Sequence, residues 1–133
     1  MKKINLACII DDDPIFVFGT KRLMELVGFC DDVVVYHNGQ EAIDGFAKRI
    51  NDGLAIPEII MLDLNMPILD GWCFLDRLNN LELPKFITIY LVSSSIDPAD
   101  MKRSENYSMI TNYIVKPITT DKLMELLEAF QGG

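Results

Sequence analysis

The sequence predicts an α/β protein with a parallel sheet covered by helices on both faces. One observation is the uncharged apolar run at residues 59–62, which is typical of a strand buried on both faces. A second is the strict alternation of short apolar runs with longer segments of helical spacing, which favours parallel strands joined by right-handed crossovers. A third is the length of 133 residues, half of them hydrophobic, which fits one domain with a full core.

Five strands and five helices account for the chain. The strands are expected at the apolar or β-branched runs 4–10, 32–36, 59–63, 86–92 and 113–115. The helices are expected to begin near Pro14, Asn38, Gly71, Asp97 and Thr119. Proline suits a first helical position at Pro14 and Pro98, and Gly28 is a typical helix end. This order predicts a doubly wound, flavodoxin-like (βα)5 fold with strand order 2-1-3-4-5.

Polar side chains follow four of these strands. They are Asp11, Asp12 and Asp13 after the first strand, Asp63 after the third, Ser93 after the fourth and Lys116 after the fifth. In a sheet of this order the carboxyl ends of these strands meet at one crevice, where such folds bind ligands. We therefore expect the acids, the hydroxyl and the ammonium group to form one site.

The residue types in this crevice indicate metal-assisted phosphoryl chemistry. Two carboxylates about 4 Å apart repel by roughly 4 kcal/mol at an effective dielectric near 20. A hard divalent cation such as Mg²⁺, or Mn²⁺, offsets that repulsion with oxygen ligands. An aspartate can then attack phosphorus, while the cation, Lys116 and Ser93 neutralise the phosphoryl oxygens.

Four segments resemble the receiver domain of two-component response regulators, of the stand-alone chemotaxis-regulator type. They are IIDDDP after the first strand, MLDLNMPILDG around Asp63, LVSSS after the fourth strand and YIVKP before the last helix. The resemblance covers essentially the whole chain. It implies a signalling phosphoacceptor in which Asp63 receives phosphate from a phosphohistidine on a histidine kinase or a histidine phosphotransfer protein.

The resemblance also assigns roles around the acceptor. It implies that Mg²⁺ is held by Asp12 directly, by Asp11 through water, by Asp63 and by the backbone carbonyl of Asn65. Asp13 matches a variable position and is not counted as a ligand. Ser93 and Tyr113 match the switch residues, which implies a changed surface over the fourth helix, fifth strand and fifth helix. The Lys116–Pro117 bond matches one that is usually cis.

Three other functions remain open at this stage. Asp11-Asp12-Asp13 formally fits the motif of a haloacid-dehalogenase-like phosphatase, in which Asp11 would be the nucleophile. A flavin-binding module would share the fold, but its phosphate loop should not be acidic. A degenerate receiver that no longer accepts phosphate is the last alternative, and the complete set of site residues argues against it.

The composition limits which binding partners and which cellular compartment are expected. The net charge of −8 makes nucleic acid an unlikely direct partner, and the apolar runs are too short to cross a membrane. Three cysteines without metal-site spacing favour a reducing, cytoplasmic location. We expect residues 1–133 to form one receiver domain with no output domain, acting on an unidentified downstream protein. Trp72 is expected near the loop after Asp63, either as a reporter of metal binding or as a packing residue.

Overall fold

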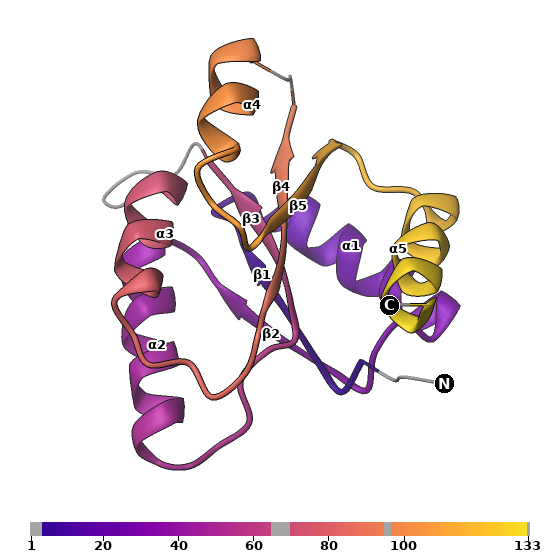
Figure 1. Cartoon of the computed structure of the whole chain (residues 1–133). Coiled ribbons are helices and arrows are strands. Elements are labelled where there is room, and N and C mark those ends of the chain that lie inside the picture. Colours follow the sequence, from indigo (N-terminus) through magenta and orange to yellow (C-terminus); the bar gives the residue numbers. More distant parts are fainter. Residues whose placement is uncertain (1–3, 65–69, 95–96, 133) are drawn as a thin grey trace.

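The computed structural model describes residues 4–64, 70–94 and 97–132 (Figure 1). Strands and helices alternate throughout. They are β1 (Leu6–Ile10), α1 (Pro14–Val27), β2 (Asp32–Tyr36), α2 (Gly39–Asn51), β3 (Ile59–Asp63), α3 (Gly71–Asn79), β4 (Thr88–Ser93), α4 (Pro98–Ser104), β5 (Ile110–Val115) and α5 (Thr120–Gly132). The order expected from the sequence is confirmed.

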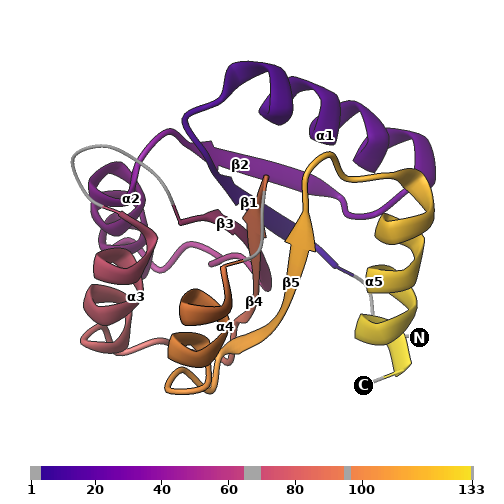
Figure 2. The ribbon, with the colours of Figure 1, turned by 90° about the horizontal axis from the view of Figure 1, so that it is seen from above.

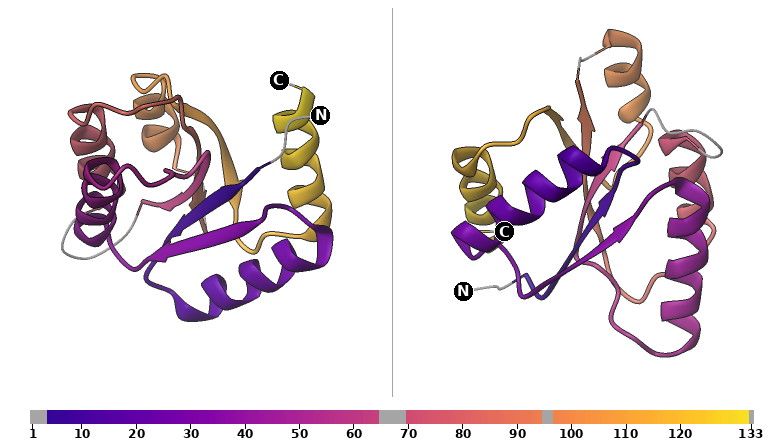
Figure 3. Two further views of the ribbon diagram at one scale, coloured as in Figure 1. Left: turned by 90° about the horizontal axis from the view of Figure 1, so that it is seen from below. Right: turned by 180° about the vertical axis from the view of Figure 1, so that it is seen from behind.

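The five strands form one parallel sheet in the order β2-β1-β3-β4-β5. Viewed from above, α1 and α5 lie on one face of the sheet, while α2 and α3 lie on the other with α4 beside them (Figure 2). The views from below and behind show the same two layers around the sheet (Figure 3). The predicted (βα)5 fold is therefore correct, and the carboxyl ends of the central strands meet at one edge.

Two hydrophobic clusters hold the layers together. The cluster under α2 and α3 is built around Phe46 and Phe74, whose ring centroids lie 6.1 Å apart in an edge-to-face arrangement. The cluster under α1 and α5 includes Phe16, Met24 and Leu123. All five residues of β3 are buried, as the uncharged run predicted, because helices cover both of its faces.

Three strands begin at other residues than predicted, and the first of them, β1, begins at Leu6 rather than at Ile4. β5 begins at Ile110 rather than at residue 113, because its first residues pair with Ile89 and Tyr90 across a register shift. The polar Thr111 and Asn112 are exposed in this edge strand, so they break the apolar pattern without breaking the strand. β4 begins at Thr88, since Phe86 is exposed and lies outside the ladder.

Gly45 in α2 is predicted to be required for packing. A Cβ atom at this position would overlap the ring and hydroxyl of Tyr36, which in turn packs against Phe46. Gly45→Ala should therefore lower the free energy of unfolding by about 1–3 kcal/mol, as overpacked cores do. Gly19→Ala in α1 is the matched control, since a Cβ there meets nothing within 4 Å. Denaturant titration should show that this control is stabilised by about 0.5–1 kcal/mol, and equal effects would contradict the prediction.

Candidate functional site

Three carboxylates converge at the ends of β1 and β3. One oxygen each of Asp11, Asp12 and Asp63 lie within 4.8 Å of one another. Asp11 and Asp63 are buried, whereas Asp12 is exposed at the mouth. The sheet order brings them together because β1 and β3 are neighbours, with Ile10 paired to Leu62. The carboxylates that the sequence predicted to converge therefore do lie together.

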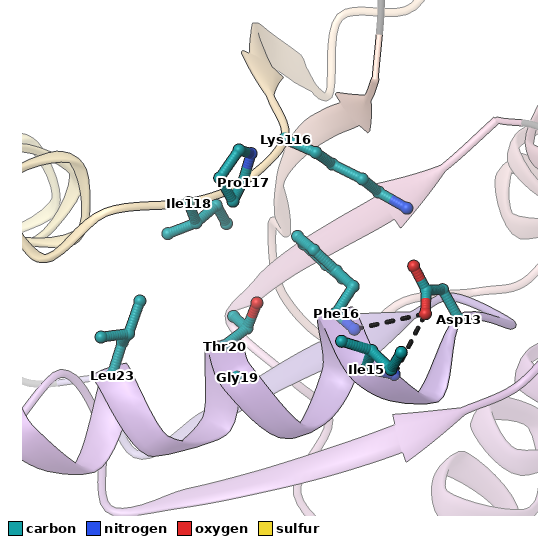
Figure 4. Close-up of a pocket in the computed structure, with 9 residues that line it drawn as sticks. All are labelled: Asp13, Ile15, Phe16, Gly19, Thr20, Leu23, Lys116, Pro117 and Ile118. Carbon is teal, nitrogen blue, oxygen red and sulfur yellow. Dashed lines mark hydrogen bonds between the residues drawn. The ribbon is translucent and has the colours of Figure 1, made fainter.

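Lys116 brings a positive charge to the same place. Its Nζ lies 2.9 Å from Asp11 Oδ2 and 3.9 Å from Asp63 Oδ2. It also lies 4.5 Å from the centroid of the Phe16 ring, a cation–π distance. Figure 4 shows Lys116 pointing from the end of β5 toward the start of α1, where Phe16 and Asp13 lie. The Lys116–Pro117 peptide bond is cis, as the resemblance implies.

Burial and charge perturb the titration of this pair. Burial raises the pKa of Asp11, the Asp13 N–H and Lys116 oppose that rise, and the Asp63 charge adds to it. Burial would lower the pKa of Lys116, but the contact with Asp11 and the charges of Asp11 and Asp63 raise it overall. Lys116 is therefore an ammonium group at neutral pH, able to pair with an anion.

The carboxylates fit a hard divalent cation. Asp11 Oδ2 is buried, and within the described residues it accepts no hydrogen bond of good geometry despite its close ion pair with Lys116. An oxygen in this condition, next to two further carboxylates, matches the all-oxygen ligand set of Mg²⁺. Asp11, Asp12 and Asp63 would hold the ion. The fourth predicted ligand, the Asn65 carbonyl, lies outside the described residues.

Local hydrogen bonds position the acids. The Asp13 N–H donates to Asp11 Oδ1 over 2.9 Å, which fixes the buried carboxylate. The Asp13 side chain caps α1 by accepting from the N–H groups of Ile15 and Phe16. Asp13 is thus occupied as a cap, in agreement with its exclusion from the predicted ligands.

Gly71 allows the start of α3 to pack closely against the backbone of Asp63 and Leu64. Its N–H donates to the Leu64 carbonyl over 3.1 Å, and a Cβ atom there would lie 2.9 Å from Leu64 Cα and 3.0 Å from the Asp63 carbonyl oxygen. Only a residue without a side chain fits this approach. The sequence marked Gly71 as a helix start, and its close packing against Asp63 and Leu64 was not foreseen.

Ser93 and Tyr113, the two residues predicted to act as a switch, lie on neighbouring strands. Ser93 is buried at the end of β4, and its carbonyl accepts from the Lys116 N–H over 2.8 Å. Tyr113 packs partly buried against the α2–α3 cluster, on the side of the sheet that carries α4. Burial and then the Asp100 charge raise the pKa of its phenol. Its hydroxyl makes no hydrogen bond of good geometry within the described residues, although Ser104 is near enough to lower that pKa.

Trp72 is buried and is therefore a packing residue, which is one of its two predicted roles. It is 6% exposed, and its ring stacks on Tyr107 with centroids 5.4 Å apart. The indole N–H donates to Asp100 in α4 over 3.3 Å. Its fluorescence should therefore report on α4. The contact between Phe16 and Lys116 was also missed, since no local pattern links residues 100 positions apart.

The family follows from this geometry together with comparison. A model of the response regulator receiver domain matches residues 7–128. The chain belongs to this family. The transcription regulator BvgA of Bordetella pertussis is 36% identical over 97% of this receiver domain, which spans 57% of BvgA's length. A two-component response regulator from Cytophaga hutchinsonii has a similar structure, with a TM-score of 0.88, 28% identity and coverage of 99% and 100% of the two chains.

A third relative shows the fold alone. The receiver domain of the sensor histidine kinase PA1611 from Pseudomonas aeruginosa, described with magnesium in its active-site cleft, matches with a TM-score of 0.77 at 18% identity. That match covers 97% of this chain and 98% of the other. Receiver domains are signalling phosphoacceptors that interact with histidine kinases or phosphotransfer proteins, and they bind Mg²⁺ at an acidic pocket.

The phosphatase alternative is not favoured. Asp11, its nucleophile, is 1% exposed and is ion-paired with Lys116, so it is poorly placed to meet a substrate. The flavin alternative is also weakened, because the carboxylates grouped at the ends of β1 and β3 would repel a flavin phosphate. Among the described residues, every helix is too short or too polar to cross a membrane.

Proposed function

We propose that this receiver domain accepts a phosphoryl group on Asp63 from a phosphohistidine, in a reaction that depends on Mg²⁺. The observation that supports this proposal is the grouping of Asp63 with two further carboxylates and the Lys116 ammonium group. Asp63 is the buried acid at the end of the central strand, and its partner Lys116 remains partly accessible from solvent. Arrangements of this kind suit transfer of a compact, multiply charged group.

The proposed step transfers a phosphoryl group from a histidine nitrogen to an aspartate oxygen. A carboxylate oxygen of Asp63 forms an O–P bond as the N–P bond of the phosphohistidine breaks, and the departing imidazole takes up a proton. Lys116 pairs with one phosphoryl oxygen, and the Ser93 hydroxyl donates to another. A bound divalent cation supplies further neutralisation of phosphoryl oxygens. Water later hydrolyses the acyl phosphate at the same site and regenerates Asp63.

Intact mass spectrometry tests this proposal. The protein is incubated with acetyl phosphate and Mg²⁺, and should gain the mass of one phosphoryl group. The same incubation with EDTA should give no gain, because the carboxylates then lack the cation that offsets their charge. Equal labelling with and without the metal would contradict the proposed Mg²⁺ dependence.

Ser93 is proposed to couple the phosphoryl group to Tyr113. Drawing the Ser93 hydroxyl toward an oxygen of the phosphoryl group leaves space that the neighbouring Tyr113 ring can enter, which would alter the face formed by α4, β5 and α5. Ser93→Ala should therefore still label at Asp63, about tenfold more slowly, since one donor is lost. Amide chemical shifts with beryllofluoride, a phosphoryl mimic, should no longer change around residues 110–117. Wild-type shifts there in the variant would refute this coupling.

The phosphodonor protein is proposed to dock along α1. Ile15, Phe18 and Leu26 of α1 are 82%, 68% and 74% exposed. Beside them a groove of about 480 Å³ runs between α1 and the segment after β5, and Lys116 lines both this groove and the site (Figure 4). A protein that presents a phosphohistidine to Asp63 would cover this apolar surface.

Phe18→Ala is expected to separate docking from chemistry. Its kcat/KM with a phosphorylated donor protein should fall about tenfold, because an exposed aromatic contact is lost, while labelling by acetyl phosphate stays unchanged. Phe86→Ala is the matched control, since Phe86 is also 68% exposed but precedes β4 at the opposite end of the sheet. Equal losses in the two variants would place the donor elsewhere.

A cytoplasmic location is part of the proposal. Cys8, Cys30 and Cys73 are all unpaired thiols. Burial raises the pKa of Cys30 to about 11, so this thiol is protonated and unreactive at neutral pH. Free thiols of this kind suit a reducing compartment.

A further inference from the structure

Helix α4 has little to hold it in place by itself. It has seven residues, and none of them is buried. A helix this short is not stable alone in water, so its position depends on side-chain contacts with the rest of the domain. Figures 1 and 2 show α4 on the same side of the sheet as α3.

Within the described residues, two side chains of α4 contact the same residue of α3. The Trp72 indole N–H donates to Asp100 Oδ1 over 3.3 Å, and the Arg103 guanidinium lies 4.7 Å from the centroid of the Trp72 ring. Tyr107, in the turn after α4, stacks on the same ring and donates its hydroxyl to Asp76 Oδ1 of α3 over 2.7 Å. We refer to these five residues as the α3–α4 contact.

Trp72 is also tied to the phosphoacceptor strand. It directly follows Gly71, whose N–H donates to the Leu64 carbonyl and whose missing side chain lets the two backbones touch. Leu64 directly follows Asp63. A shift of the Asp63–Leu64 backbone would therefore meet Gly71 directly, next to Trp72. This path does not pass through Ser93 or Tyr113.

We propose that Trp72 restrains α4 in the unphosphorylated domain and forms a second route from Asp63 to α4. Only the second route rests on the proposed phosphorylation of Asp63. The restraint itself is a property of the unphosphorylated protein. In this view phosphorylation weakens the α3–α4 contact and frees α4, while the Ser93–Tyr113 pair acts on β5. The two routes thus act on neighbouring parts of the face formed by α4, β5 and α5.

Hydrogen exchange of the unphosphorylated protein tests the restraint. Trp72→Phe keeps an aromatic ring but loses the donor to Asp100, and Tyr107→Phe loses only the hydroxyl that reaches Asp76. Each should raise the exchange rates of amides 101–107 about tenfold, because local opening becomes easier. Amides of α2 should keep their wild-type rates, which excludes a general loss of stability. Unchanged rates at 101–107 in both variants would overturn the restraint.

Beryllofluoride tests the second route. In Ser93→Ala, amide shifts at 98–107 should still change, and the double variant Ser93→Ala/Trp72→Phe should lose that change. If Ser93→Ala alone abolishes the shifts at 98–107, the second route is wrong. If neither the wild type nor any variant responds to beryllofluoride, the second route and the proposed function are both refuted. The restraint of α4 in the unphosphorylated protein is then still decided by the exchange experiment.

Discussion

Asp63→Asn is expected to take up no phosphoryl group from acetyl phosphate or from a phosphorylated donor protein. The amide that replaces the carboxylate has no anionic oxygen to attack phosphorus, and the change in volume is small. The β3 strand and its pairing with β1 and β4 should persist, because the Asp63 backbone forms the ladder. Intact mass spectrometry with Mg²⁺ present should show complete loss of labelling, while circular dichroism stays that of the wild type.

The same substitution should change the pH dependence of stability in a defined direction. The Asp63 charge helps to raise the pKa of Asp11, so the folded wild type holds that proton more tightly than the unfolded chain. Stability is therefore lost as pH rises through the raised pKa of Asp11. In metal-free Asp63→Asn this loss should be smaller, as measured by denaturant titration on both sides of that pKa.

Asp13→Asn is the matched control for this experiment. Asparagine caps helices about as well as aspartate, so α1 should keep its first turn and labelling should continue.

Stoichiometric labelling of Asp63→Asn would show that another acid is the acceptor. Asp11 would then be the first residue to examine, since the phosphatase alternative assigns the nucleophile to it.

Asp12→Ala is expected to weaken Mg²⁺ binding by about 100-fold, since a direct carboxylate ligand is lost from an ion that takes few protein ligands. Asp12 is the exposed member of the three carboxylates, so the fold should tolerate its removal. Labelling by acetyl phosphate should decline in parallel at a fixed, subsaturating Mg²⁺ concentration. Titration calorimetry, or amide shifts of residues near β1 and β3, gives the affinity.

Asp44→Ala controls for the loss of one negative charge. Asp44 is exposed on α2, where it accepts from Gln40, and it is not among the three carboxylates of the site. This variant should bind Mg²⁺ like the wild type, because Asp44 supplies no oxygen to the cluster of carboxylates. Wild-type affinity in Asp12→Ala would show that the ion is held without Asp12.

The α3–α4 contact adds further residues to those proposed to control the face formed by α4, β5 and α5. The sequence pointed to Ser93 and Tyr113 alone, and both do lie on adjacent strands at the α4 side of the sheet. The short, unburied α4 depends in addition on Trp72. Substitutions in the α3–α4 contact should thus alter signalling without touching the acceptor site.

The amino-acid sequence by itself determined the element order, the strand order and the set of strand-end residues. Each rests on a local pattern. The uncharged run before Asp63 marks a doubly covered strand, and proline or glycine marks helix ends such as Pro14 and Gly28. Parallel topology then carries the strand ends to one edge, because right-handed crossovers leave few alternatives. These rules were enough to group Asp63 with Lys116.

Tertiary structure alone decided which side chains touch. The ring of Phe16 under Lys116, the backbone approach at Gly71 and the burial of Trp72 against α4 join segments whose separation leaves no periodic signal. The start of β5 could not be predicted for a related reason. Its first residues include exposed polar side chains, and they belong to the strand because β5 pairs with β4, not because they follow an apolar pattern. Local sequence patterns reflect burial along one element, whereas contacts between elements depend on how their faces are packed together.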